Sequence, residues 1–89
     1  MKLEYRVFET NGTQTKFKTT NPVPDGHWES LVRGDISLRY FTDDKVLIYN
    51  SSNNFPKNQT AEDYLQKCGI KLEKPLTGMV IISDIKLIN

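Results

Sequence analysis

The stretch that most constrains this chain is its apolar C-terminal segment, residues 78–88. Residues 79–82 are apolar at every position, which is typical of a strand covered on both faces. After Ser83 apolar and polar residues alternate, which predicts that Asp84 and Lys86 point outward into water. The alternative is a buried Asp84 carboxylate, which would need a partner or a raised pKa. Unpaired, such a β-branched run would aggregate, so we expect a central strand whose neighbours in the sheet come from upstream.

Leu3, Tyr5 and Val7 alternate with the residues between them, which is typical of a half-buried strand, and Asn11-Gly12 after it marks the turn of a β-hairpin. A two-residue turn would place two lysines on the apolar face of the first strand. A three-residue loop, with Gly12 left-handed in a bulge, instead pairs Tyr5 with Phe17. The sequence therefore predicts the three-residue loop.

A short helix is predicted where Trp28, Leu31 and Val32 follow one another at i, i+3 and i+4. Asp25 can cap its start and Gly34 can end it. A strand that buries alternate residues from Trp28 onward is the alternative.

Residues 35–50 predict a second hairpin with a tight turn at Asp43-Asp44. That register places five apolar residues on one face: Ile36, Leu38, Tyr40, Leu47 and Tyr49. It leaves the opposite face to Ser37, Arg39, Phe41, Val46 and Ile48.

Apolar side chains at positions 61, 64, 65 and 68 share one face of a second helix, predicted over residues 61–68. Thr60 and Asp63 resemble a capping box at its start. Gly69 suits a left-handed residue after its end, and Ile70 can pack back on the last turn in a Schellman motif.

These elements predict an α+β fold of order ββαββαβ. It has one mostly antiparallel sheet of about five strands, two hairpins plus the central C-terminal strand, with one short and one two-turn helix. Residues 1–89 are expected to form one small domain, because a second would lack a core.

Composition excludes several classes of protein. The 12 basic and 11 acidic residues are interspersed, so the chain has no basic tail for nucleic acid. One cysteine cannot form an internal disulfide, the N-terminus lacks a signal-peptide core, and no apolar run approaches the length of a membrane span. We therefore expect a soluble cytoplasmic protein without membrane association.

Catalytic and metal chemistry is not indicated. The glycines are scattered, and His27 and Cys68 are the single histidine and cysteine, so neither a phosphate loop nor a metal-ligand spacing is present. Cys68 shares the helix face of Leu65 at the end where the dipole opposes a thiolate, so we expect a buried structural thiol. His27 is expected to pack beside Trp28. We expect no catalytic residue, metal or cofactor, and no enzyme.

One surface remains as a candidate site. The predicted registers gather basic, aromatic and apolar side chains on the outward sheet face: Lys2, Arg6, Phe8, Lys16, Lys18, Arg39, Phe41, Val46 and Ile48. Such a mixture suits an acidic protein surface or a stacking platform for single-stranded nucleic acid. A third reading is a second core under one helix, with lysines at its rim, formed by Phe41, Val46, Ile48, Val80 and Ile82.

The sequence thus predicts a small non-enzymatic binding protein, such as an inhibitor, adaptor or accessory subunit, that occupies a protein partner. The expected contacts on this face are Arg6, Lys16, Lys18, Arg39 and Phe41. A small nucleic-acid-binding regulatory protein is the alternative, which the near-zero net charge disfavours.

Overall fold

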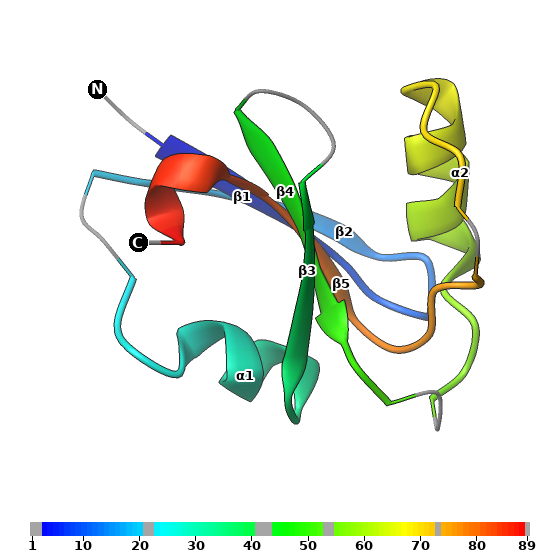
Figure 1. The fold of residues 1–89 in the computed structure, drawn as a ribbon, viewed down its shortest axis with the longest axis horizontal. Coiled ribbons are helices and arrows are strands. Elements are labelled where there is room, and N and C mark those ends of the chain that lie inside the picture. The colour runs from blue at the N-terminus through cyan, green and yellow to red at the C-terminus, as the bar shows by residue number, and fades with distance from the viewer. Residues whose placement is uncertain (1–2, 21–22, 41–43, 53–54, 73, 89) are drawn as a thin grey trace.

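The computed structural model describes residues 3–20, 23–40, 44–52, 55–72 and 74–88 (Figure 1). In chain order its elements are β1 (Leu3–Phe8), β2 (Gln14–Thr19), α1 (His27–Val32), β3 (Ile36–Tyr40), β4 (Lys45–Asn50), α2 (Gln59–Lys67), β5 (Val80–Asp84) and the short 3-10 helix η1 (Ile85–Leu87). The predicted α+β fold and its order ββαββαβ are confirmed.

The five strands form one antiparallel sheet in the order β2-β1-β5-β4-β3. β5 is the middle strand, as its apolar run predicts, and its residues 80–83 are all buried. The segment that would aggregate if left alone is therefore paired on both sides and covered on both faces.

Helices cover the two faces of the sheet from opposite sides (Figure 1). On one face, here called the α1 face, α1 and η1 pack on a cluster that includes Tyr5, Val7, Val46, Ile48 and Ile81. On the other, the α2 face, α2 packs on Phe8, Leu47, Val80 and Ile82. None of the helices in the described residues is long and apolar enough to span a bilayer.

The first hairpin has the predicted three-residue loop. Tyr5 pairs with Phe17, and their rings stack with centroids 4.9 Å apart. Gly12 has a φ of 94°, a left-handed conformation that strongly favours glycine. Across this loop the Glu9 N–H donates to the Thr13 carbonyl at 2.9 Å.

The predicted register of the second hairpin is wrong by one residue. Leu38 pairs with Ile48 and Tyr40 with Val46, so Leu47 lies on the α2 face instead of beside Leu38. β4 is buried on both faces, so its own pattern could not reveal which side chains face which way. Antiparallel pairing with β5 decides it, because Ile48 lies opposite Ile81 in the α1-face core. Asp43 of the predicted turn lies outside the described residues, and so does Phe41 before it.

The short segment after the prolines is a helix, as predicted, but its caps differ. Its N-cap is Gly26, which has a φ of 79° and makes no side-chain cap. Its C-cap is Arg33, which is also left-handed. The His27 N–H donates to the Pro24 carbonyl at 3.1 Å, so a backbone turn replaces the predicted Asp25 cap. Gly34 has a different use: a Cβ there would lie 2.8 Å from the amide nitrogen of Asn50.

α2 begins two residues before the predicted start, and Asn58, not Thr60, is its N-cap. Its end is the predicted Schellman motif: the Ile70 N–H donates to the Leu65 carbonyl and the Gly69 N–H to the Gln66 carbonyl, both at 3.0 Å.

Two further expectations are corrected. Cys68 is exposed, because α2 buries Ala61 and Leu65 while Cys68 is the C-cap that follows the helix. The alternation after Ser83 does not continue as a strand. The chain turns into η1 and buries Leu87, while Asp84 is half-buried and hydrogen-bonded.

Candidate binding groove beside β3

The structure does not gather the predicted contact residues into one site. Arg6, Lys16, Lys18 and Arg39 all lie on the α2 face by their strand registers. However, Arg39 is on an edge strand three positions from β1, which corresponds to about 14 Å across the sheet. Phe41 lies outside the described residues.

Several of these basic side chains already have partners within the chain. The Lys16 ammonium is 3.4 Å from a carboxylate oxygen of Glu4, and the Arg6 guanidinium lies 5.0 Å from the centroid of the Tyr64 ring. Arg39 donates to the Lys71 carbonyl at 3.0 Å. Arg6 on β1 and Lys16 on β2 therefore lie at the rim of the packed α2 face.

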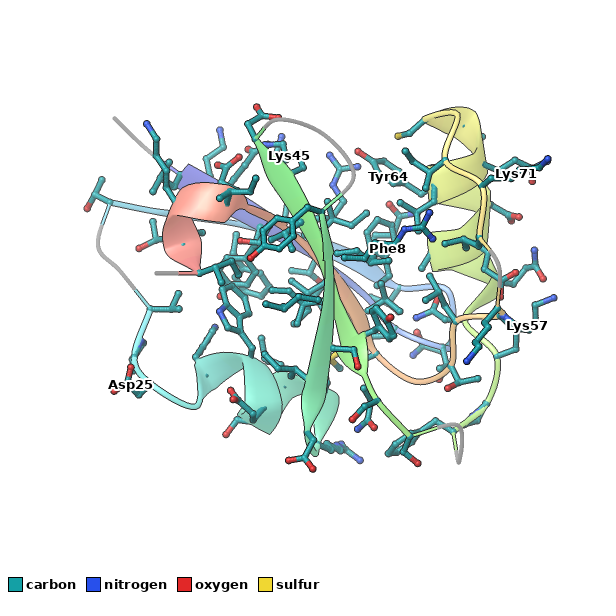
Figure 2. The ribbon with its side chains drawn as sticks, in the orientation of Figure 1. Phe8, Asp25, Lys45, Lys57, Tyr64 and Lys71 are labelled. Atoms are coloured by element: carbon teal, nitrogen blue, oxygen red, sulfur yellow. The ribbon has the colours of Figure 1, made fainter. Side chains whose placement is uncertain are left out.

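The middle of that face is a second core, so the third reading of this surface is confirmed in part. Phe8 is fully buried and its ring centroid is 5.2 Å from that of Tyr64; Figure 2 shows both between the sheet and α2. Val80 and Ile82 belong to this core, as that reading expected. Val46 and Ile48 lie on the opposite face, because of the shifted register.

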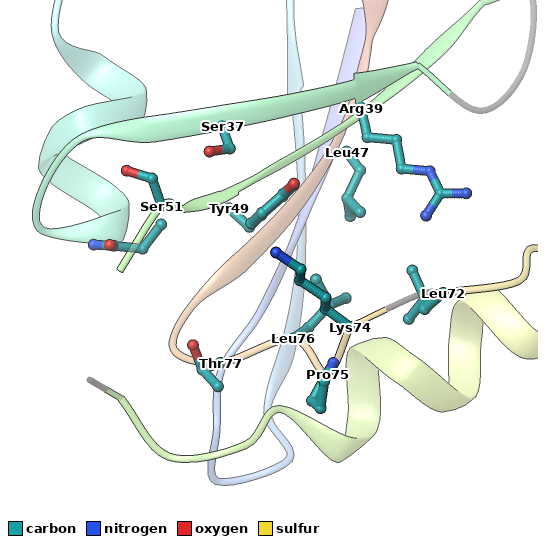
Figure 3. A pocket seen from close by; sticks show the side chains of 11 residues that line it. Ser37, Arg39, Leu47, Tyr49, Ser51, Leu72, Lys74, Pro75, Leu76 and Thr77 are labelled. Carbon is teal, nitrogen blue, oxygen red and sulfur yellow. The ribbon is translucent and has the colours of Figure 1, made fainter. Parts of the chain in front are cut away.

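A groove of about 550 Å³ opens on the α2 face between the β3–β4 hairpin and the segment that follows α2 (Figure 3). Leu47 and Leu76, both buried, form its apolar floor. Three residues that carry hydroxyl groups also line it from the strands and from the loop: Ser37, Tyr49 and Thr77.

The charges of the groove have one sign. Among its described lining residues the charged ones are Arg39 on β3 and Lys74 on the loop, both cationic. Figure 3 shows the Lys74 side chain extending from the loop toward the strands, and Arg39 at the far end of the hairpin wall. The groove therefore suits a ligand with negative charge and some apolar surface.

The loop wall is held in place by backbone and side-chain hydrogen bonds. The Asn58 N–H donates to the Leu76 carbonyl at 2.7 Å, and the Leu76 N–H donates to a carboxylate oxygen of Glu62 at 3.2 Å. The Thr77 hydroxyl donates to the Ser52 carbonyl at 3.3 Å. These bonds attach the wall to α2 and to the end of β4, which favours a preformed site.

A second polar cluster lies where β1, β4 and β5 meet. Asp84 accepts hydrogen bonds from the Lys45 ammonium and, at 2.8 Å, from the Glu4 N–H. Burial alone would raise the pKa of Asp84, but those two hydrogen bonds and the charge of Lys45 outweigh it and lower the pKa. Burial likewise opposes the charged form of Lys45, yet the bond and charge of Asp84 raise its pKa.

This cluster acts as a structural ion pair. The cavity that Glu4 and Lys45 of this cluster line is about 30 Å³, far smaller than the groove beside β3. Asp84 therefore has bonding partners where the alternation predicted a solvated side chain.

His27 packs on Trp28 as predicted, with ring centroids 5.0 Å apart, and its Nε2 is 3.2 Å from the Tyr5 hydroxyl. Burial raises the pKa of Tyr5. Within the described part of the chain, no three His, Cys, Asp or Glu side chains are close enough together to hold a metal ion.

Comparison of this chain with protein-family models, curated proteins and solved structures found no match. The fold class and the groove are therefore the basis for any functional argument. The sequence pattern pointed to Arg39 but not to Lys74, which lines the groove from a loop without periodicity. It also placed Tyr49 on the wrong face, because the predicted register was shifted.

Proposed function

We propose that this chain is a non-enzymatic binding protein whose groove beside β3 holds an acidic, extended segment of a protein partner. The observation that carries the proposal is the pairing of two cations, Arg39 and Lys74, with the apolar floor of Leu47 and Leu76. An inhibitor, adaptor or accessory subunit acts in this way, by occupancy alone.

The shape of the groove supports an extended segment. Its β4 wall runs from Leu47 to Ser51, about 13 Å of strand, so it matches some four residues of extended chain. Alternating side chains of such a segment would meet the apolar floor and the cationic rim in turn. The volume also lies in the range of ligand sites, about 300–1,000 Å³.

A protein partner is favoured over nucleic acid because bases need exposed aromatic faces for stacking. On the described part of the α2 face, Phe8 is buried, Tyr64 is covered by Arg6, and Tyr49 is half-buried. Only the charge of the groove suits a phosphate backbone, and the net charge of the whole chain is +1.

The proposal can be tested with a capped peptide that alternates glutamate and leucine, titrated while backbone amide NMR signals are followed. We expect shifts confined to the groove walls and weaker binding at higher salt. The double variant R39E/K74E should weaken binding at least tenfold, since it reverses both rim charges.

The matched control is K16E/K18E, which reverses two lysines on the far edge strand and should leave peptide affinity unchanged. Equal binding of the peptide by R39E/K74E, or shifts centred on β2, would contradict the proposal. Tighter binding of a single-stranded oligonucleotide than of the peptide would replace it with the nucleic-acid alternative.

A further inference from the structure

The two edge strands of the sheet differ in what their outer backbone presents. The Ser51 N–H donates to the Asp35 carbonyl at 3.0 Å, in the same register as the β3–β4 pairs. Because antiparallel strands alternate, Ser37 and Arg39 then bond to β4. The backbone N–H and C=O groups of Ile36, Leu38 and Tyr40 therefore point away from the sheet.

On β2 the same reasoning exposes the backbone of different residues. The Glu9 N–H donates to the Thr13 carbonyl, so the backbone groups of Thr15 and Phe17 bond to β1. The backbone groups of Lys16 and Lys18 therefore point away from the sheet. Lysines on an edge strand are a common protection against pairing with another chain. β2 has this protection.

β3 lacks it. The residues of β3 whose backbone points away from the sheet all have apolar side chains. Two of these side chains are well exposed, Leu38 at 38% and Tyr40 at 59%. An edge with free backbone groups and apolar side chains is a template for one more strand.

We propose that β3 pairs antiparallel with β3 of a second copy about a two-fold axis at Leu38, which joins the two five-stranded sheets into one. Leu38 then lies opposite Leu38 of the second copy, and Ile36 lies opposite Tyr40, all on the α1 face. On the α2 face, Arg39 lies opposite Ser37, so like charges do not oppose one another.

The neighbouring registers are poorer. A shift of two residues in one direction would place Arg39 directly opposite Arg39 of the second copy, which is destabilising. The shift in the other direction would pair Tyr40 with Gly34, whose N–H already donates to the Glu29 carbonyl at 3.1 Å. The register centred on Leu38 alone pairs every residue of β3.

This dimer would also complete the groove. Ser37 and Arg39 both line it, so the second copy places its Arg39 beside Ser37 of the first and adds a cation to each groove. The dimer interface itself does not depend on the proposed peptide binding, since it involves the backbone edge and the α1-face side chains.

The first test is the mass in solution, measured by light scattering and by sedimentation over a range of concentrations without any peptide. We expect a concentration-dependent dimer that L38K converts to a monomer, while circular dichroism shows an unchanged fold. F17K is the matched control, because Phe17 is exposed to a similar extent, 41% against 38% for Leu38, but lies on β2. A monomer at every concentration, or a dimer that L38K leaves intact, overturns the proposal.

The second test reads the register. In a C68S background, which removes the exposed native thiol, L38C should form a disulfide-linked dimer on mild oxidation, because paired Cα atoms lie about 5.5 Å apart. F17C in the same background should remain monomeric. Cross-linking of F17C but not L38C would overturn the β3 interface, even if peptide binding to the groove is found.

Discussion

Asn58 joins several parts of this fold through its hydrogen bonds. Its side-chain oxygen accepts from the Ala61 N–H at 3.1 Å and so caps α2. Its amide nitrogen donates to the carbonyls of Phe8 at 2.8 Å and Gly78 at 2.7 Å, and the residue is fully buried. The side-chain amide thus attaches the helix to β1 and to the turn before β5, while the backbone N–H of Asn58 bonds to Leu76 in the loop wall of the groove.

We expect N58D to destabilise the protein by about 3 kcal/mol, because a carboxylate would face two carbonyl oxygens in a buried site. The helix cap itself would survive, since aspartate also accepts at an N-cap. Urea denaturation measures the loss.

The control for N58D is N11D, where an exposed side chain accepts from the Thr13 N–H at 2.9 Å and aspartate does the same. We expect a change within about 0.5 kcal/mol there. A similarly small change for N58D would mean that its two donor bonds contribute little.

At the scale of elements, the two hairpins show when a register can be predicted. β1 and β2 carry polar side chains on one face and have a glycine in their loop, so a slip of one residue would bury lysines. β4 is apolar on both faces, and either register satisfies its own pattern. The long-range pairing of β4 with β5 determines which register forms.

The first hairpin also allows a direct measurement. We expect G12A to cost about 1 kcal/mol, because a Cβ is disfavoured at a φ of 94°. Space is not the reason, since the nearest atom to such a Cβ, the Thr60 hydroxyl oxygen, would be 3.7 Å away. T10A in the same loop is the control in thermal and urea denaturation, and equal stability of the two variants would contradict the backbone argument.

At the scale of the whole molecule, stability should depend on pH through the pair that joins the central strands. The pKa of Asp84 is lowered from its ordinary 3.8, so its contribution is present above that pH and is lost as the pH falls through the lowered value. The pKa of Lys45 is raised from 10.5, so its contribution is present below that pH and is lost at more alkaline pH.

D84N should therefore cost about 1–2 kcal/mol at neutral pH, and the difference from the unmodified protein should shrink in acid. Urea denaturation at several pH values measures this. D63N, at an exposed carboxylate bonded to Gln59, should cost little at any pH. A penalty for D84N that persists unchanged in strong acid would show that the pair is not the cause.

The order of elements, the central place of β5 and the Schellman end of α2 all followed from the sequence, because each depends on local pattern or turn chemistry. The tertiary structure decided the β3–β4 register, the exposure of Cys68 and the partners of Asp84. It also formed the groove, which both Arg39 of β3 and Lys74 of a distant loop line. The physical reason is that a strand buried on both faces, a helix end and a loop side chain take their surroundings from segments far away in the chain.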